Sequence, residues 1–177
     1  MNIDHKLSHS LFNLARSHWV GRHLAILAGT HIIWLMLGVL LAATAWNKET
    51  LAFTVDRYTL LLLVFLLPAW GVTMLLSKFV NRERPFEELH QQPLIAPFVR
   101  TASFPSAHAT FAFSMAAMCS LFFPSILPYM LGAAIVVALG RVAAGLHFFS
   151  DIIVGALVGF GVTPYTMAII MVALGYD

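Results

Sequence analysis

Five apolar stretches dominate this sequence and restrict the folds that are open to it. They cover residues 23–46, 58–77, 102–123, 127–145 and 151–174. About 20 apolar residues suffice for an α-helix to cross the hydrocarbon of a bilayer. The sequence therefore predicts an all-α, polytopic membrane helical bundle with about five transmembrane helices.

The composition supports this assignment. Of the 177 residues, 60% are hydrophobic and 10% are charged, and the mean hydropathy is +0.85. Ordinary globular chains carry about a quarter charged residues. The net charge is only +2 and no basic run is present, so nucleic acid is not expected as a partner. The single cysteine, Cys119, is expected to be a buried packing residue.

The N-terminal segment, residues 1–22, is interpreted as a helix lying in the membrane interface. Leu7, Leu11 and Leu14 follow helical spacing among charged and histidine residues, which is typical of amphipathic interfacial helices. A disordered tail is the alternative. Without a repeat or a linker, the whole chain is expected to form one integral-membrane domain, in which residues 23–177 form the transmembrane bundle.

Counting the crossings predicts where the polar segments lie. With five spans, residues 78–108 and 141–151 fall on the same face of the membrane as the N-terminal helix. Residues 47–57 and 124–128 fall on the opposite face. The polar clusters described next can therefore meet at one interface.

One cluster joins the fourth and fifth apolar stretches and contains Arg141, His147 and Asp151. Ionisable groups are costly at bilayer depth and usually face a partner or a watery cavity. If residues 148–155 continue as a helix, His147 and Asp151 are four apart and share one face. A carboxylate beside an imidazole fixes its tautomer and raises its basicity, as a nucleophilic histidine requires. A structural ion pair at a capped helix end is the alternative.

A second cluster, residues 104–110, begins the third span. Ser106 can cap the helix, whose free N–H groups and positive dipole end make an anion site. His108 beside this site is well placed to protonate a leaving oxygen. The alternative is a capped helix with an interfacial histidine.

The third cluster follows the second span. Pro85 restricts Arg84 to extended backbone conformations and so aims its side chain, and Lys78 with Arg84 suits a phosphate. Arg82 is also explained by snorkelling towards lipid headgroups. His31, within the first span, is expected to be a hydrogen-bonded core histidine rather than a neighbour of the site.

Together the clusters supply cations, an anion-binding helix start, an orientable nucleophile and a general acid. The sequence has no cysteine cluster, paired-carboxylate metal motif or glycine-rich nucleotide loop, so neither a metal nor another cofactor is expected. Metal-free phosphoryl transfer through a phosphohistidine fits this set of groups, because charge on the phosphoryl oxygens is stabilised mainly by positioned donors and cations.

The three clusters resemble the signature of the type-2 phosphatidic acid phosphatases, which share a core with vanadium haloperoxidases. The resemblance runs from about Tyr58 to Gly159 and rests on Lys78-x5-Arg84-Pro85, Pro105-Ser106-Ala107-His108 and Arg141-x5-His147-x3-Asp151. It implies a helical membrane enzyme that removes a terminal phosphate from a lipid phosphate or diphosphate without a metal.

The resemblance also implies roles for individual residues. His147 would be the nucleophile, Asp151 its orienting partner and His108 the general acid. The phosphoryl oxygens would be held by Lys78, Arg84, Ser106 and Arg141, assisted by the Ala107 backbone N–H.

Three positions depart from the family pattern. The spacing from Lys78 to Arg84 is one residue shorter than usual, which weakens the assignment of Lys78. Ala107 stands where glycine is common, and Gly140 stands where a serine often precedes the arginine.

The short chain, the Arg-Pro-Phe sequence and the five-span layout are most similar to the bacterial undecaprenyl-diphosphate phosphatases of this family. This implies a multi-pass protein of the bacterial cytoplasmic (inner) membrane, with its site facing the periplasm. The positive-inside rule, applied to Lys6, Arg16 and Arg22, favours the opposite sidedness. Phosphatidylglycerophosphate, phosphatidic acid and lipid A phosphatases share the signature. A haloperoxidase-like oxidase and a non-catalytic lipid-binding or transport protein are further alternatives.

Overall fold

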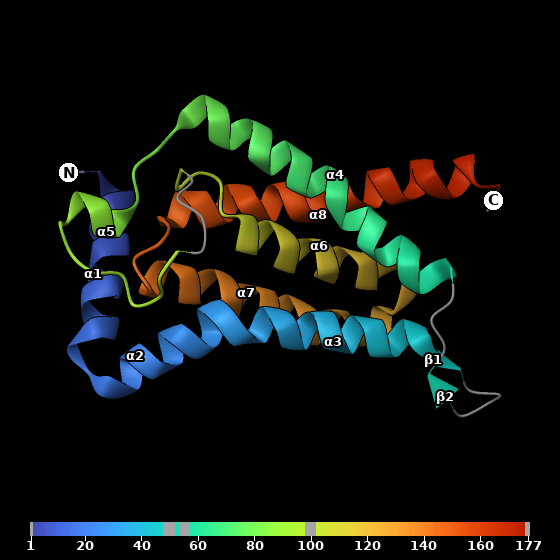
Figure 1. Ribbon diagram of the computed structural model, residues 1–177, viewed down its shortest axis with the longest axis horizontal. Helices are drawn as coiled ribbons and strands as arrows, with labels where there is room; N and C mark the ends of the chain where they lie inside the picture. Colours follow the sequence, from blue (N-terminus) through green and yellow to red (C-terminus); the bar gives the residue numbers. More distant parts are fainter. Residues whose placement is uncertain (1, 48–51, 54–56, 98–101, 176–177) are drawn as a thin grey trace.

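The computed structural model describes residues 2–47, 52–53, 57–97 and 102–175. Long helices run along one common direction, and a shorter helix lies across one end of them (Figure 1). The helices are α1 (Ile3–Ser17), α2 (Trp19–Ile26), the π-helical turn η1 (Leu27–His31), α3 (Ile32–Ala45), α4 (Arg57–Val80), α5 (Pro85–Glu88), α6 (Ala107–Phe122), the 3₁₀ turn η2 (Pro124–Ile126), α7 (Leu127–Ala143) and α8 (Phe149–Ala173). Two short strands, β1 (Trp46–Asn47) and β2 (Ala52–Phe53), pair antiparallel between α3 and α4.

Four helical segments of the described chain are long and apolar enough to cross a membrane: Trp19–Ala45, Leu60–Glu88, Pro124–Ala143 and Phe149–Ala173. A fifth apolar helix, α6, has 16 residues. It packs against α3, α4, α7 and α8, and most of its side chains are buried. The predicted all-α membrane bundle of about five helices is confirmed, and the shortest of the five is its central helix.

Helix α1 forms the predicted N-terminal element. It lies across the end of the bundle, roughly perpendicular to the long helices (Figure 1). The chain bends at His18, whose backbone is extended, and the next residues already belong to the first span. The N-terminal helix is therefore shorter than residues 1–22. A disordered tail is wrong, because Phe12 and Ala15 of α1 are buried.

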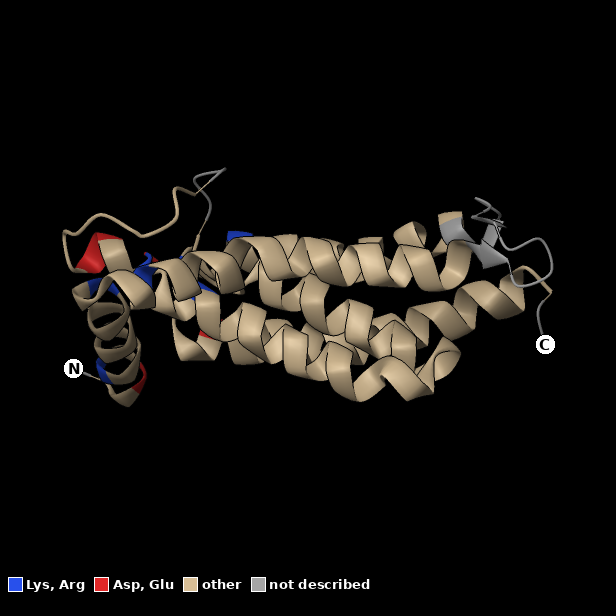
Figure 2. Cartoon of the chain, turned by 90° about the horizontal axis from the view of Figure 1, so that it is seen from below, with Lys and Arg blue, Asp and Glu red and all other residues tan. Residues whose placement is uncertain are grey.

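The alternation of the spans brings the polar segments to one end. The last turns of α4 and α7 and the first turns of α6 and α8 lie at the end covered by α1 and α5 (Figure 1). Figure 2 shows that the charged residues of the described helices gather mostly at this end. The η2 turn and the β1–β2 pair lie at the opposite end.

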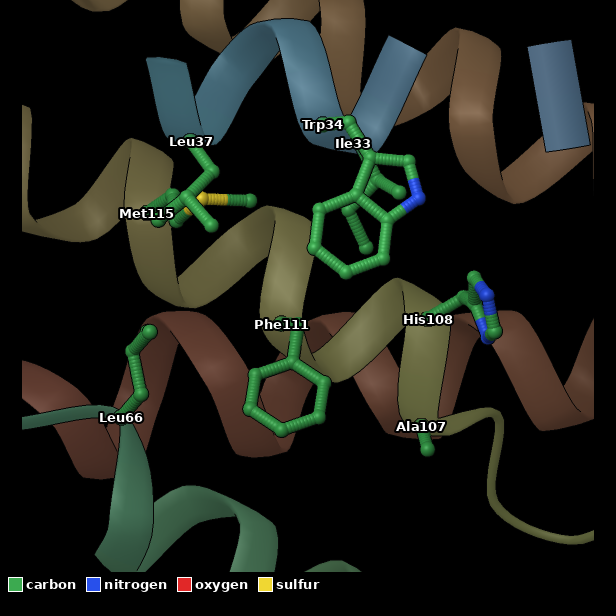
Figure 3. Close-up of a pocket in the computed structure, with 8 residues that line it drawn as sticks. All are labelled: Ile33, Trp34, Leu37, Leu66, Ala107, His108, Phe111 and Met115. Atoms are coloured by element: carbon green, nitrogen blue, oxygen red, sulfur yellow. The ribbon is translucent and has the colours of Figure 1, made fainter. Parts of the chain in front are cut away.

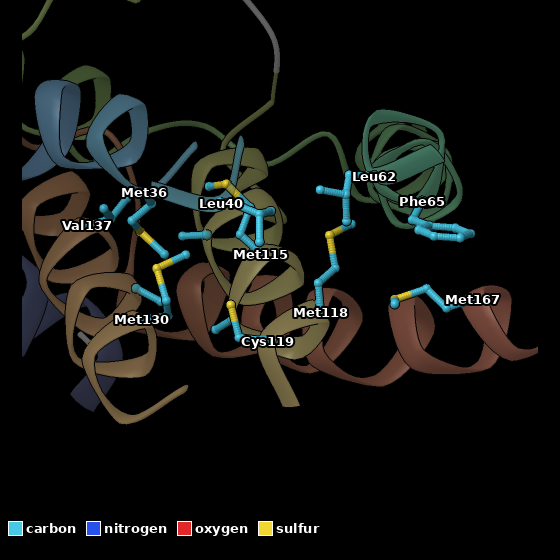
Figure 4. Close-up of a cluster of buried hydrophobic side chains, with 13 residues drawn as sticks. Met36, Leu40, Leu62, Phe65, Met115, Met118, Cys119, Met130, Val137 and Met167 are labelled. Carbon is cyan, nitrogen blue, oxygen red and sulfur yellow. The ribbon is translucent and has the colours of Figure 1, made fainter. Parts of the chain in front are cut away.

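The larger of the two core clusters of the described residues is rich in methionine (Figure 4). Its buried residues include Met36, Leu40, Leu62, Phe65, Met115, Met118, Met130 and Met167. Methionine is unbranched and adaptable, so it fills the irregular spaces between crossing helices. Cys119 is fully buried in this cluster, as expected.

Small residues let α6 and α8 approach closely, as membrane helices do at small-residue contacts. A Cβ on Gly159 would lie 2.3 Å from the Thr110 carbonyl oxygen. Beside this contact, the Thr163 hydroxyl donates to Ser114 Oγ at 2.9 Å. The start of α6 is thereby fixed against α8, and each of these helices carries part of the polar site.

The expectation for His31 is wrong. Its side chain is exposed at the end of η1, so it is not a core histidine.

Candidate active site

The three polar clusters meet around a cavity of about 380 Å³ at the α1 end of the bundle. Its walls come from the last turns of α4, the segment after α5, the start of α6, the end of α7 and the turn before α8. The lining residues are Trp70, Met74, Ser77, Arg84, Pro97, Ala102, Pro105, Ala107, His108, Arg141 and His147. Two arginines and two histidines in one cavity make it suited to an anion.

The start of α6 is built as the sequence suggests. Ser106 is the N-cap, and its Oγ accepts from the Ala109 N–H at 3.4 Å. Ala107 and His108 form the first turn and line the cavity. Because Ser106 is fully buried and its hydroxyl is used by the cap, binding of phosphate by this hydroxyl stays a prediction.

His147 does not lie on a helix. Helix α8 begins at Phe149 and Phe148 is its N-cap, so His147 and Asp151 do not share a helical face as expected. The ring is instead held by the backbone: Nδ1 lies 2.7 Å from the Ser103 carbonyl oxygen and 3.8 Å from Asp151 Oδ2. A carbonyl oxygen can only accept, so Nδ1 carries the proton and Nε2 keeps a free lone pair.

Asp151 is fully buried and has other close partners. Its Oδ2 accepts from the Phe148 N–H at 2.7 Å and from Ser103 Oγ at 2.5 Å, and its Oδ1 accepts from Arg82 at 2.8 Å. Asp151 thus fixes the loop that carries the Ser103 carbonyl and acts on His147 by its nearby charge. Ser103 was missed by the sequence reasoning, since a lone serine in a loop carries no recognisable signal.

The surroundings of His147 lower its pKa. Burial is the main cause, the positive charges of Arg141 and Arg84 add to it, and the Asp151 carboxylate opposes it. The imidazole is therefore neutral at pH 7, as a nucleophile must be.

Arg141, near the C-terminal end of α7, is 6% exposed and lines the cavity. Its NH1 group donates to the Gly29 carbonyl oxygen at 3.0 Å. Gly29 belongs to the π-helical turn η1, and such turns free carbonyls from the regular helical pattern. The Arg141 Nε is buried and has no hydrogen-bond partner among the described residues, so it remains available to an anion in the cavity.

The close approach of η1 also explains why a glycine precedes Arg141. A Cβ on Gly140 would lie 2.5 Å from the Gly29 backbone nitrogen and 2.6 Å from the Ala28 Cβ. A serine at this position would push η1 away from α7. The departure from the family pattern at Gly140 is a consequence of this packing.

The turn between Arg141 and His147 depends on Gly145. Its φ is +78°, in the left-handed region that favours glycine. Phe12 of α1 covers it so closely that a Cβ would lie 2.8 Å from the ring, and the Gly145 carbonyl accepts from the Phe86 N–H at 3.1 Å. Helices α1 and α5 therefore shape the turn that leads to His147.

Arg84 and Lys78 have different environments. Arg84 is 5% exposed, lines the cavity and has the extended backbone expected before proline, with φ −89° and ψ 153°. Lys78 is exposed and is not among the residues that line the cavity. It makes no hydrogen bond or ion pair within the described part of the chain. Its phosphate-binding role stays a prediction.

Arg82 does not simply snorkel towards headgroups. Its guanidinium donates to Asp151 Oδ1 at 2.8 Å and to Asp4 Oδ2 at 2.9 Å, and it stacks 3.8 Å above the Phe148 ring. The Asp4 carboxylate also accepts from Ser150 at the start of α8. Arg82 thereby connects α1 to the carboxylate behind the site. A buried charge such as that of Asp151 requires a cationic partner, and Arg82 supplies it.

Comparisons with known proteins identify the family of the chain. The sequence model of the PAP2 superfamily matches residues 57–173, which is more than half of the chain. The chain belongs to the PAP2 superfamily. The expected family is thus confirmed. No curated protein matches the chain in sequence.

Two solved structures have the same fold. LpxE of Aquifex aeolicus is 22% identical, with a TM-score of 0.69 over 95% of this chain and 96% of that one. The first transmembrane PAP2-type phosphatidylglycerolphosphate phosphatase of Bacillus subtilis is 18% identical, with a TM-score of 0.63 over 96% and 89%. This PAP2 chain therefore has the fold of the membrane lipid phosphatases and is a multi-pass membrane protein.

Proposed function

We propose that this PAP2 protein is a metal-independent lipid phosphatase, which removes the terminal phosphate of a lipid phosphate or diphosphate. The observation that carries the proposal is a second, apolar pocket of about 340 Å³ that shares Ala107 and His108 with the polar cavity. The walls of this pocket come from α3, α4 and α6 and include Trp34 and Phe111 (Figure 3). An amphiphile fits both: its phosphate beside the histidines and arginines, its apolar chain between the helices.

The residues of the polar cavity allow hydrolysis of the phosphate ester in two steps. In the first, the Nε2 lone pair of His147 attacks phosphorus, and the bond from phosphorus to the lipid-side oxygen breaks. That oxygen takes a proton from His108, which must carry one when the phosphate dianion is bound. The phosphohistidine ring is then cationic, and its Nδ1–H remains bonded to the Ser103 carbonyl with the Asp151 charge nearby.

In the second step, a water attacks the phosphohistidine while neutral His108 takes one proton from it. The bond between phosphorus and Nε2 breaks, phosphate leaves, and the lone pair returns to His147. Arg84 and Arg141 stabilise the charge on the phosphoryl oxygens in both steps, with the Ala107 N–H at the helix start as a further donor.

Undecaprenyl diphosphate is the proposed substrate, on the strength of the motif resemblance. Phosphatidylglycerophosphate, phosphatidic acid and lipid A are the alternatives, and the structural similarity to the Bacillus subtilis phosphatidylglycerolphosphate phosphatase favours the first of these. The polar cavity would bind only the phosphate group of the lipid. Selectivity between lipid tails would therefore depend on the apolar pocket.

The test is phosphate release by the purified protein in detergent with excess EDTA. Undecaprenyl diphosphate, phosphatidylglycerophosphate and phosphatidic acid are offered in parallel, with His147→Ala as the blank. We expect chelator-resistant release that disappears in the variant, and fastest turnover of undecaprenyl diphosphate. Release that requires an added metal would overturn the mechanism, and the absence of release from every lipid would favour a non-catalytic lipid-binding protein.

We further propose that the protein lies in the bacterial cytoplasmic membrane with the α1 end facing the periplasm. Asn13 of α1 is exposed, whereas the single native cysteine is buried. A membrane-impermeant maleimide should therefore label Asn13→Cys in intact spheroplasts. Labelling only after lysis would place this end in the cytoplasm.

A further inference from the structure

Two histidines of α1 and a glutamate of α5 converge outside the polar cavity. His5 and His9 are one helical turn apart and share a face of α1, and Glu88 is the last residue of α5. His5 Nδ1 lies 3.0 Å from Glu88 Oε1, and His9 Nε2 lies 3.5 Å from Glu88 Oε2. One ligand atom from each residue lies within 4.8 Å of the others.

His9 is the member of this cluster that calls for a ligand. It is 6% exposed, and its Nε2 is buried without a hydrogen-bond partner among the described residues. Leaving such a buried group unpaired destabilises the folded state. Its Nε2 lies 3.5 Å from the Glu88 carboxylate, and the ligand atoms of His5, His9 and Glu88 lie within 4.8 Å of one another.

The spacing of these atoms matches a tetrahedral metal. Zinc binds imidazole nitrogen and carboxylate oxygen at about 2.0–2.2 Å, which places two tetrahedral ligand atoms about 3.4 Å apart. The separations of the imidazole nitrogens from Glu88, 3.0 Å to Oε1 and 3.5 Å to Oε2, lie on either side of this value, and all three ligand atoms lie within 4.8 Å of one another. Two imidazoles and a carboxylate are also a donor set that zinc favours.

We propose that His5, His9 and Glu88 bind Zn²⁺, with water in the fourth position, and that the ion clamps α1 onto α5. Because Arg84 is the N-cap of α5 and Phe12 of α1 covers Gly145, the clamp would steady two walls of the phosphate cavity. None of its three ligands lines that cavity, so its role is structural and independent of the proposed phosphatase chemistry.

Arg82 and Asp4 are the charged neighbours of the proposed Zn²⁺ site. Without a metal, His5 donates from Nδ1 to Glu88, and its Nε2 accepts from Arg82 at 3.0 Å. A metal on Nδ1 moves the ring proton to Nε2, so the contact with Arg82 is given up. Arg82 keeps Asp4 and Asp151 as partners, and the carboxylates of Asp4 and Glu88 offset its charge near the ion.

The experiment is a calorimetric titration of Zn²⁺ into the full-length, tag-free protein, stripped of metal and kept in detergent. We expect one ion per chain, and binding at least about tenfold weaker in His9→Ala and in Glu88→Gln, since even indirect metal partners are worth about 10–100-fold. His23→Ala, which removes an exposed histidine of α2, should bind as the unaltered protein does.

Thermal unfolding provides the second readout. Glu88→Gln is the variant least expected to misfold, because glutamine is nearly isosteric with glutamate and the Glu88 side chain is half-exposed. Zn²⁺ should raise the Tm of the unaltered protein and of His23→Ala but not that of Glu88→Gln. Absence of Zn²⁺ binding, or equal binding by all the variants, would overturn the proposal. Phosphate release in EDTA at a temperature below unfolding should persist in either case, so this test and that of the phosphatase fail separately.

Discussion

At the end of the bundle covered by α1, buried polar groups such as Asp151 are held by directional hydrogen bonds, whereas the methionine-rich core is held by nondirectional apolar contacts. Asp151 and Met118 are both fully buried. Asp151 accepts from Arg82, Ser103 and the Phe148 N–H. Met118 belongs to the apolar core cluster.

The two regions depend on different properties of their residues. In the core, volume and apolar character decide, and a residue of similar size can replace another at small cost. At the polar end, the number and direction of donors and acceptors decide, so an isosteric change can be worse than a change of size. The predictions below separate these two kinds of constraint.

The largest combined loss of stability and rate is expected for Asp151→Asn. The amide keeps the shape but removes the charge that Arg82 pairs with, and breaking a buried pair costs about 3–5 kcal/mol. The rate of phosphate release should fall about 10²-fold. A larger loss is not expected, because the Ser103 carbonyl still holds the Nδ1 proton of His147. Turnover and thermal unfolding check this. Asp4→Asn, which leaves Asp151 unchanged, is the control. An equal loss of rate in both variants would contradict the specific role of the Asp151 charge.

Met118→Ala tests the core. The cavity it leaves should cost about 1–3 kcal/mol, less than in a soluble protein because the unfolded helix would bury the side chain in lipid rather than water. Turnover per folded molecule should be unchanged. Unfolding in detergent measures the first expectation and single-turnover kinetics the second. Met118→Leu, which nearly conserves the volume, should change neither the free energy of unfolding nor the turnover appreciably. A loss of rate in this variant would show that packing of the core affects the active site.

The pH dependence follows from the lowered pKa of His147. Between that pKa and the value of about 6.5 in the unfolded chain, the unfolded state binds more protons. The free energy of unfolding should therefore decrease as the pH falls below about 6.5, while the folded imidazole stays neutral. Titration of ¹³C-labelled histidine by NMR, with His147→Ala to assign the signal, should give a midpoint below 6.5. A midpoint above 6.5 would mean that Asp151 outweighs burial and the two arginines.

A smaller effect is expected for Gly140→Ser, which restores the residue common in the family. Its Cβ would meet the backbone of η1, and such overpacking costs about 1–3 kcal/mol. The displaced Gly29 carbonyl would also loosen Arg141, so KM should rise more than kcat falls. Gly132→Ser, with open space around its Cβ position, is the matched control.

Much of the fold could be predicted because the length of an apolar stretch fixes a crossing, and the number of crossings fixes which loops share a face. The extended backbone of Arg84 and the cap at Ser106 were also predictable, since both depend on neighbours in the sequence. The tautomer of His147 was not. It depends on Ser103, 44 residues earlier in the chain, which only the packing of α6 on α8 brings into place.

Arg82 and Gly140 were missed for a similar reason. A cation at the end of a span looks the same in the sequence whether it meets lipid or Asp151, and a glycine before Arg141 looks like the loss of a hydroxyl. Both are explained by contacts with α1 and η1, elements that lie outside the conserved spacing of the three motifs and outside residues 57–173.

Lys78→Ala should have the smallest effect and is the sharpest test of motif against structure. The motif assigns Lys78 to the phosphate, but its side chain is exposed and does not line the cavity, whereas Arg84 is buried and does. We therefore expect kcat/KM to change by no more than about threefold in Lys78→Ala and to fall by at least about 10²-fold in Arg84→Ala, because a charged donor to the phosphoryl group is lost only in the second. Steady-state kinetics of both variants on one lipid decides. A comparable loss in Lys78→Ala would mean that the last turn of α4 swings the lysine into the cavity when the phosphate binds, and the exposed position would then belong to the resting enzyme alone.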